Sequence, residues 1–293
     1  MVKVERRIVK GKTYYYLEHS VRKEGKVSKK RFYLGKELPK DLEKRKVEFL
    51  NEVYKEKWFT EFDELKKAHA KKESDLPPSA KDKQLQQFSI RFTYDSNRIE
   101  GSTLSLKETA DLLERGVTPR EKPVQDVKEA EAHDELFKEM LDYKKDLSLS
   151  TVLYWHKKLL EATKLDIAGV VRRHQVRISR SKFVPPLAVE VEPMLSDFFK
   201  WYEKSRVKLH PAELAALVHL KFVTIHPFAD GNGRISRLLM NFVLNKHGFP
   251  MLNIHYANRN SYYNALERAQ VKENDSIFLN WFFKRYKKEL ERF

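Results

Sequence analysis

A short polar loop joins two apolar segments of the sequence, and its residues are the ones that could do chemistry. It reads His226-Pro-Phe-Ala-Asp230-Gly-Asn-Gly-Arg234, with Arg237 three positions further on. Gly231 and Gly233 permit positive φ, so that successive amides can converge on an anion. The two arginines supply permanent charges in a planar geometry that suits phosphate oxygens. The loop therefore predicts a site for a polyphosphate.

Two further side chains extend the site toward group transfer. Asp230 offers a hard carboxylate oxygen of the kind that holds Mg²⁺, or equally Mn²⁺, against phosphate groups. His226 titrates near neutrality, so it can accept a proton from an attacking hydroxyl. Each residue alone has a plainer interpretation, since a histidine at a helix end is usually a cap or a core residue and Asp-Gly usually marks a turn. Together they indicate phosphoryl-type transfer.

The segments on either side of the loop are predicted helices. Pro211 to Ile225 is apolar on most sides and should form a central buried helix. That helix should end near His226, because Pro227 disfavours helical geometry in the residue before it. After the loop, apolar residues recur at helical spacing from Ile235 to Val243. Two buried helices therefore hold the polar loop between them.

The twelve residues from His226 to Arg237 resemble the signature of Fic-domain proteins, H-P-F-x-[D/E]-G-N-G-R-x-x-R, at every defined position. The resemblance covers about residues 85–285. It implies a nucleotidyltransferase that moves AMP from ATP to a hydroxyl side chain of a target protein. It further implies that His226 deprotonates the target and that Asp230 binds the metal ion. The implied nucleotide ligands are Gly231, Asn232 and Gly233 on the transferred phosphate, Arg234 and Arg237 on the β and γ end, and Tyr262 or Tyr263 on the adenosine.

An earlier segment, Ser96-Asn-Arg-Ile-Glu100-Gly101, resembles the inhibitory motif of the same family, [S/T]-x-x-x-E-[G/N]. The residues before it are helix-like, and Gly101 suits the position just after a helix end. Glu100 would there need a cation, because the helix dipole disfavours an anion. We expect that cation to be Arg237, so that the pair keeps the guanidinium from ATP and holds the enzyme autoinhibited. In some relatives the same glutamate helps to remove AMP from the target, an activity that stays open here.

The stretch from Gln175 to Val191 combines β-prone residues with Pro185-Pro186 and predicts a β-hairpin flap. In the family this flap aligns an extended segment of the target by main-chain pairing, a form of β-augmentation. The expected docking residues are Ile178, Phe183 and Val184. The expected partner is a protein that presents a hydroxyl on an extended segment.

The first 36 residues predict a small β module. The expected strands centre on Arg7 to Val9, Tyr14 to Leu17 and Arg31 to Leu34, with turns at Lys10-Gly11 and Glu24-Gly25. A helix should follow from about Leu38 to Lys72, and the proline-rich Ser74 to Ser79 is the expected boundary. The fold class is mainly α: a Fic-type helical bundle over residues 77–293 with its inhibitory helix at about 85–101, preceded by a β-plus-helix module over residues 1–75.

Basic charge is concentrated in the same module. Residues 1–40 hold 13 Lys or Arg and 4 Glu, a net charge of +9 out of +16 for the chain. Lys and Arg interleave there with tyrosines, as in sheets that bind nucleic acid. The alternative function is thus a nucleic-acid-associated regulator acting through residues 1–40. A solvated β surface explains the same residues equally well.

Composition excludes several other classes. The chain has no cysteine, which rules out disulfides, thiolate metal sites and thiol nucleophiles. No stretch has the length and hydrophobicity of a membrane span or a signal peptide, so we expect a cytoplasmic protein without a membrane partner. A homodimer is left open.

Overall fold

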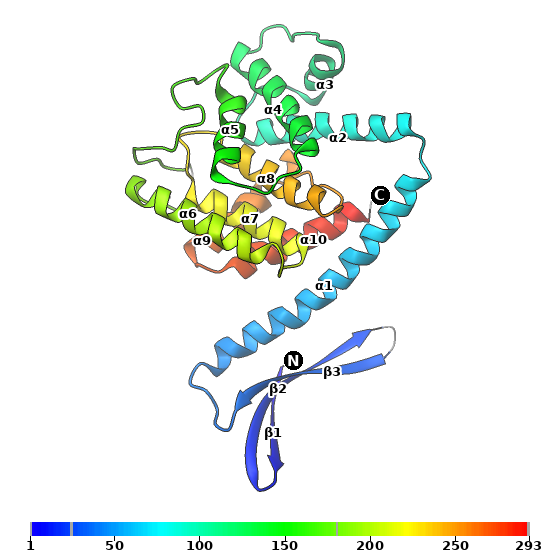
Figure 1. Cartoon of the computed structure of the whole chain (residues 1–293), viewed down its shortest axis with the longest axis vertical. Helices are drawn as coiled ribbons and strands as arrows, with labels where there is room; N and C mark the ends of the chain where they lie inside the picture. The colour runs from blue at the N-terminus through cyan, green and yellow to red at the C-terminus, as the bar shows by residue number, and fades with distance from the viewer. Residues whose placement is uncertain (1, 24–25, 180, 292–293) are drawn as a thin grey trace. The chain divides into compact units, whose positions relative to one another are not determined.

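The computed structural model describes residues 2–23, 26–179 and 181–291 (Figure 1). It divides into two compact units, with the division between Glu64 and Leu65. The turn expected at Glu24-Gly25 lies outside the described residues. Mainly helical structure, with a small sheet at the amino end, agrees with the predicted fold class.

The first unit is an antiparallel sheet with strand order β1-β2-β3 that packs against a helix. Its elements are β1 (Lys3–Val9), β2 (Lys12–Lys23), β3 (Lys26–Gly35) and the first part of α1 (Leu42–Ser74). Lys10 and Gly11 both have positive φ, as a two-residue hairpin turn requires. The core consists of Leu17 and Leu34 on the sheet and Phe49 and Val53 on α1. All three predicted strands are confirmed.

Helix α1 ends just before a pair of prolines. Pro77 is in extended geometry before the start of α2 (Pro78–Ile99), and Pro78 takes the first helical position, where a missing N–H costs nothing. The boundary expected at residues 75–77 is therefore the break between two helices. The compact units instead divide within α1.

The second unit consists of helices joined by short loops. They are α2, α3 (Leu106–Arg115), α4 (Val124–Asp142), α5 (Leu149–Leu160), α6 (Ala188–Ser205), α7 (Pro211–Ile225), α8 (Asn232–Lys246), η1 (Tyr256–Asn258), α9 (Arg259–Val271) and α10 (Asp275–Leu290). Helix α3 begins at a capping box of Ser105 and Glu108 and ends at Gly116, which is left-handed. Helix α7 has the predicted bounds.

Helices α7 and α8 form the centre of this unit. They pack on each other, with α6 and α10 against α7 and with α2, α4 and α5 against α8 (Figure 1). Nearly every residue of α7 is buried, and α8 is buried at Asn232 and from Arg234 to Leu244. The loop between them is therefore held at both ends by helices that the core fixes in place.

The expected β-hairpin between Gln175 and Val191 is wrong. Among the described residues, 172–187 contain no strand, and Val189 and Val191 belong to α6. Pro185 and Pro186 have no N–H to donate to a ladder. Side chains take carbonyls that a hairpin would have paired, since Arg172 binds the carbonyl of Pro186 and Gln175 that of Pro185. The segment is an extended loop.

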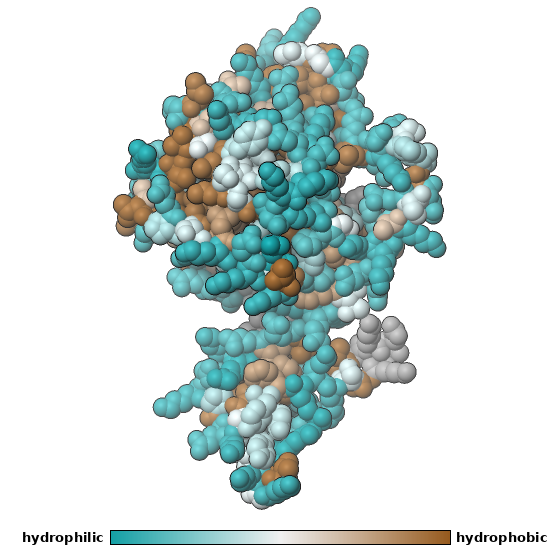
Figure 2. Space-filling model, viewed as in Figure 1, coloured by the Kyte–Doolittle hydropathy of each residue, from teal (hydrophilic) through white to brown (hydrophobic). Residues whose placement is uncertain are grey.

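Figure 2 shows a mostly polar surface, with apolar side chains gathered on the side of the second unit where α6 and the loop before it lie. The exposed apolar residues in and around this loop include Val170, Val184, Leu187 and Val189. Within the described ranges, no helix combines the length and the apolar character that crossing a bilayer demands.

Candidate active site

The loop between α7 and α8 is a tight bend closed by one amide side chain. His226 ends α7 in left-handed geometry, at φ 50° and ψ 59°, and Gly231 precedes α8 at φ 77°. Asn232 accepts a hydrogen bond from the Phe228 amide at 2.9 Å and donates one to the Phe228 carbonyl at 2.8 Å. Asn232 thus closes the loop through both polar atoms of its amide.

The His226 ring is oriented so that one nitrogen remains available. Nδ1 lies 3.2 Å from the carbonyl oxygen of Val223, and this carbonyl can only accept, so Nδ1 carries the proton. Nε2 of the neutral ring is then the basic nitrogen. Burial lowers the pKa of His226 below its usual value, which keeps the ring neutral at physiological pH. His226 has the protonation state of a general base.

Arg172 fixes the backbone of His226, a role that the sequence did not reveal. Its side chain is 3% exposed, and Nε donates to the His226 carbonyl at 2.8 Å. Its backbone amide donates to the Pro227 carbonyl at 2.9 Å. The other guanidinium nitrogens donate to the carbonyls of His174 and Pro186, at 3.1 and 2.7 Å. One buried cation therefore ties the loop to both ends of the 174–186 segment.

A second histidine, His156, supports the loop by packing against Phe228 and by hydrogen bonding to the backbone of Asp230. The rings of His156 and Phe228 stack with centroids 3.6 Å apart. His156 Nδ1 accepts from the Gly169 amide at 2.9 Å, so Nε2 carries the proton and donates to the Asp230 carbonyl at 3.0 Å. Burial lowers the pKa of His156 to about 4, so the ring stays neutral. Phe228, 1% exposed, anchors the loop in the core.

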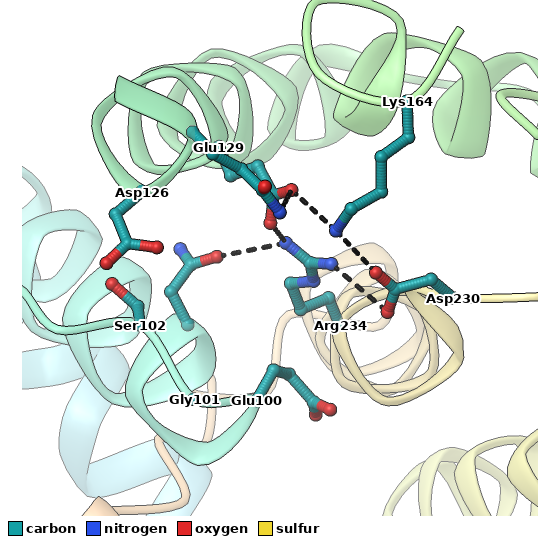
Figure 3. A pocket seen from close by; sticks show the side chains of 10 residues that line it. Glu100, Gly101, Ser102, Asp126, Glu129, Lys164, Asp230 and Arg234 are labelled. Atoms are coloured by element: carbon teal, nitrogen blue, oxygen red, sulfur yellow. Dashed lines mark hydrogen bonds and ion pairs between the residues drawn. The ribbon is translucent and has the colours of Figure 1, made fainter. Parts of the chain in front are cut away.

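Asp230 lies in a network of charges that surrounds a polar pocket of about 160 Å³ (Figure 3). Its Oδ1 accepts from the Gly231 amide at 2.6 Å and lies 3.5 Å from Nη2 of Arg234. Its Oδ2 lies 2.6 Å from Nζ of Lys164. Burial alone would raise the pKa of Asp230, but Arg234 and Lys164 outweigh it and the pKa is lowered. The carboxylate is therefore ionised at neutral pH.

The carboxylate of Asp230 fits a role as a ligand of a divalent cation. Its side chain is 38% exposed at the pocket, and an ammonium group already lies against Oδ2. A hard, ionised oxygen beside a helix amino terminus is the donor that Mg²⁺ takes together with phosphate oxygens. Among the described residues no cluster of three or more His, Asp or Glu could bind a metal by itself. The fit is thus to a cation that a nucleotide helps to hold.

Arg234 is paired with a carboxylate from another helix. It is 2% exposed and forms an ion pair with Glu129 of α4. Glu129 also lies 2.9 Å from Lys164. Burial alone would raise the pKa of Glu129, but Arg234 and Lys164 lower it. Neither Glu129 nor Lys164 was predicted, because no local pattern marks them.

The ion pair expected between Glu100 and Arg237 is present. Oε1 of Glu100 lies 2.6 Å from Nη2 of Arg237, whose side chain is 1% exposed. Ser96 accepts from Nε of Arg237 through its hydroxyl at 3.0 Å and from Nη2 through its carbonyl at 2.9 Å. The Glu100 carboxylate lies so close over Gly233 that a Cβ there would overlap it. Gly101, at φ 106°, ends the helix as predicted.

The two tyrosines after the loop have different environments. Tyr262 is 1% exposed, and its hydroxyl lies 3.0 Å from Nε2 of His219 in the core. Tyr263 is 43% exposed and donates to the carbonyl of Ile99 at 2.8 Å. Of the two, Tyr263 has the ring surface that a nucleotide could reach.

The docking residues lie along the extended loop before α6. Val184 is 63% exposed, while Ile178 and Phe183 are half-buried. Glu267 of α9 fastens this loop, because its Oε2 accepts from the Ser181 hydroxyl at 3.2 Å and from the Lys182 amide at 2.8 Å. The loop is therefore held in an extended course beside the catalytic bend.

Comparison with known families identifies a domain within this unit. The Fic/DOC family matches residues 146–244, a range that contains α7, the loop and α8. The chain contains a Fic domain. The Fic domain thus includes His226, Asp230 and both arginines of the loop, while Glu100 lies before the matched range.

Curated relatives are named protein adenylyltransferases. The chain is 35% identical over 181 residues to "Protein adenylyltransferase Fic" of Nematostella vectensis, which is 60% of this chain and 42% of that protein. It is 36% identical over 180 residues to the protein of the same name from Drosophila yakuba, covering 60% and 36%. The match therefore spans about two fifths of the length of these relatives.

Solved structures of Fic proteins have a similar fold. Residues 134–508 of Fic-1 from C. elegans superpose with a TM-score of 0.74 at 26% identity, covering 86% of this chain and 74% of that one. A Fic-domain-containing signaling protein from Bacteroides thetaiotaomicron gives a TM-score of 0.69 at 27% identity, covering 80% and 93%. The Fic fold thus extends well beyond residues 146–244.

Proposed function

We propose that this Fic protein transfers AMP from ATP to a hydroxyl group of a target protein. The observation that carries the proposal is the protonation state of His226, whose Nδ1–H is bound to Val223 and whose Nε2 is left as a base. That base stands at the end of a loop with anion-binding geometry. The names of the relatives support AMP as the transferred group.

In the proposed reaction, Nε2 of His226 takes the proton from the target hydroxyl. The hydroxyl oxygen bonds to the α-phosphorus of ATP, and the bond from that phosphorus to the bridging oxygen breaks. Pyrophosphate leaves with the electron pair. The amides of Gly231 and Gly233, at the amino end of α8, hold the transferred phosphate, and Arg234 and Arg237 bind the β and γ end.

A divalent cation, Mg²⁺ or Mn²⁺, would be held by Asp230 and would neutralise charge on the phosphates when bound. Asp230 is suited to this because its Oδ1 is oriented by the Gly231 amide at 2.6 Å. The other oxygen is paired with Lys164, which lines the pocket together with Asp230. Tyr263 would then contact the adenosine with its exposed ring.

The proposal includes autoinhibition by Glu100. Its carboxylate occupies the space above Gly233 and neutralises Arg237. A triphosphate in the productive pose needs both the space and the cation. Breaking the pair would leave Arg237 buried and unpaired unless a phosphate replaced the carboxylate, so inhibitor and substrate compete for one guanidinium. This competition also gives the buried Glu100–Arg237 ion pair a role in regulation, since such a pair need not add to the stability of the fold.

Removal of AMP is a second activity of the same site. The Glu100 carboxylate, 30% exposed, can orient a water toward the phosphorus of a modified target. The water oxygen would bond to phosphorus as the bond from phosphorus to the target oxygen breaks. Nε2 of His226 would take a proton from the water and pass it to the leaving target oxygen, and AMP would be released. Glu100→Gly should then raise AMP transfer and abolish AMP removal from an already labelled target.

The target would dock along the extended loop that runs past Ile178, Phe183 and Val184. Arg172 and Gln175 hold the carbonyls of Pro186 and Pro185, and Glu267 holds Lys182. Residues between these anchors have backbone groups to offer an extended peptide by β-augmentation. Exposed Val184, Leu187 and Val189 supply apolar contacts.

The test incubates the full chain with Mg²⁺ and ATP labelled at the α-phosphate. Glu100→Gly should raise labelling of the protein itself or of lysate proteins by about tenfold or more. His226→Ala in that background should lower it at least about 100-fold, since a general base contributes about that much. Labelling that appears only with γ-labelled ATP would replace AMP transfer by phosphate transfer. Labelling that persists in His226→Ala would remove His226 from the chemistry.

A second candidate function concerns the first unit, which would bind nucleic acid. The sheet face opposite Leu17 carries Tyr14, Tyr16 and Tyr33, whose rings lie 5.2 Å (Tyr16 and Tyr33) and 6.3 Å (Tyr14 and Tyr33) apart. Arg7 lies over Tyr16 at 5.6 Å. Aromatic faces among basic residues are what single-stranded nucleic acid stacks on.

This candidate is tested by fluorescence anisotropy with labelled single-stranded DNA and RNA. Tyr14→Ala with Tyr33→Ala should weaken binding by the full chain at least about tenfold, at about 1 to 3 kcal/mol per stacked base. Tyr154→Ala, an exposed tyrosine on α5, is the control. Binding should also fall steeply with salt. Equal binding by all variants would leave the sheet as a solvated surface.

A further inference from the structure

One ammonium group joins the two carboxylates beside the Fic loop. Nζ of Lys164 lies 2.6 Å from Oδ2 of Asp230 and 2.9 Å from Oε1 of Glu129. Figure 3 shows the side chain reaching toward the loop from the segment that follows α5. Neither the loop signature nor the inhibitory motif requires a cation there. The position of Lys164 thus needs its own explanation.

Hydrogen bonds fix the backbone of Lys164 and so place its side chain within reach of the two carboxylates. Its amide donates to the carbonyl of Leu160 at 2.7 Å, and its carbonyl accepts from the amide of Ala168 at 3.1 Å. Burial alone would lower the pKa of Lys164, but Asp230 and Glu129 outweigh it and the pKa is raised. The side chain is therefore charged at neutral pH.

The two carboxylate oxygens of Asp230 have different partners, and only one of these partners can be exchanged without disturbing the loop. Oδ1 is bound to the Gly231 amide at 2.6 Å, a bond within the loop that orients the carboxylate. Oδ1 also lies 3.5 Å from Nη2 of Arg234. Oδ2 is paired with Lys164, which lines the pocket together with Asp230. Oδ2 is therefore the oxygen whose present partner a divalent cation would replace, and such an ion meets the Lys164 ammonium there.

Resting on the AMP transfer proposed above, we infer that Lys164 is the built-in counter-cation of Asp230, which a divalent ion must displace in order to bind. Glu129 gives the displaced ammonium a second partner, because it already lies 2.9 Å from Nζ. Oδ2 of Asp230 thereby keeps a cationic partner while no nucleotide is bound. The cost of displacement makes metal binding depend on the phosphates that arrive with it.

Lys158 provides a matched control. Its Nζ lies 2.5 Å from Oε2 of Glu139, and the two side chains are 39% and 32% exposed. It belongs to α5, close in sequence to Lys164, yet its carboxylate partner is not part of the pocket. Loss of Lys158 removes one ammonium and one ion pair without touching Asp230.

The experiment titrates the full chain with MnCl₂ in the absence of nucleotide and follows free Mn²⁺ by electron paramagnetic resonance. Lys164→Met should bind Mn²⁺ about tenfold more tightly than the parent at one site, because a like charge at Oδ2 is gone. Adding Asp230→Asn to Lys164→Met should abolish that site. Lys164→Arg, which keeps a cation, and Lys158→Met should both bind as the parent does.

Two results would overturn the inference. Unchanged Mn²⁺ binding by Lys164→Met would mean that the ammonium does not compete, and tighter binding that survives Asp230→Asn would place the ion elsewhere. Calorimetric unfolding of each variant establishes that the fold is intact. The AMP-labelling assay separates this inference from the proposed function. Transfer by Glu100→Gly with unchanged Mn²⁺ binding in Lys164→Met removes only the role of Lys164. A new Mn²⁺ site in Lys164→Met without any transfer by Glu100→Gly removes the proposed function.

Discussion

The guanidinium Nε of Arg172 donates to the carbonyl oxygen of His226 at 2.8 Å. His226 has positive φ, a conformation that costs free energy for a residue with a Cβ and persists only when its surroundings hold it. Arg172 supplies that constraint from the segment before the docking loop. The geometry of the catalytic base and the course of the loop thus depend on one buried side chain.

Arg172→Met should therefore reduce AMP transfer strongly. Three backbone carbonyls lose their donor, which should lower the free energy of unfolding by about 1 to 3 kcal/mol. We expect the labelling rate in the Glu100→Gly background to fall at least about tenfold at temperatures where the protein is still folded. Arg173→Met, a change at the exposed neighbour, is the control. A rate unaffected by Arg172→Met would show that His226 needs no such support.

Ser96→Ala should partly release the inhibited state. The Ser96 hydroxyl accepts from Nε of Arg237 at 3.0 Å and helps to hold the guanidinium against Glu100. Its loss should raise AMP labelling in the chain that keeps Glu100, by less than Glu100→Gly does. Ser79→Ala, in the exposed first turn of α2, should change nothing. A lower labelling rate in Ser96→Ala would indicate that the hydroxyl serves the nucleotide instead.

The acid limb of the pH-rate profile should lie below the usual range of histidine. Burial lowers the pKa of His226, while the Glu100 charge raises it. Protonated His226 cannot accept the target proton, so activity is lost only below this lowered pKa. In Glu100→Gly one of the two charges that raise the pKa, Glu100 and Asp230, is gone, and the limb should move to still lower pH. Initial rates between pH 5 and 8 check this, and a midpoint above about 6.5 contradicts it.

His255 should make stability depend on pH at the alkaline side. Hydrogen bonds to Asp95 and Glu289 raise its pKa to about 9. A raised folded-state pKa means that this stabilisation is fully present below about pH 6.5 and is lost as pH rises toward 9. Tm should therefore fall over that range in the parent and fall less in His255→Gln. His174→Gln, at an exposed histidine, is the control. Identical profiles of Tm against pH in the parent and in His255→Gln would show that His255 does not contribute to the pH dependence of stability.

Local features of the sequence were sufficient for the helices that hold the loop. Pro211 to Ile225 has the predicted bounds because Pro211 suits a first turn and Pro227 ends the helix. The capping box of Ser105 and Glu108, a local pattern S-x-x-E, starts α3. The prediction of a hairpin between Gln175 and Val191 was wrong because contacts outside the local pattern decided the conformation. Its β-prone residues were outweighed by side-chain bonds from Arg172 and Gln175, which a local pattern does not contain.

The sequence by itself determined the loop, its flanking helices and the glutamate that faces it, because these depend on residues close together or on two short motifs. Only the tertiary structure decided the partners of the charges. Glu129 is 105 positions from Arg234, and Lys164 is 66 positions from Asp230. The chain has 58 basic and 42 acidic residues, and charge alone would allow any of the basic residues to pair with any of the acidic ones. The pairs are selected by packing, because α4 and the segment after α5 are buried near the start of α8. Burying a charge costs free energy unless an opposite charge or a hydrogen-bond partner lies beside it.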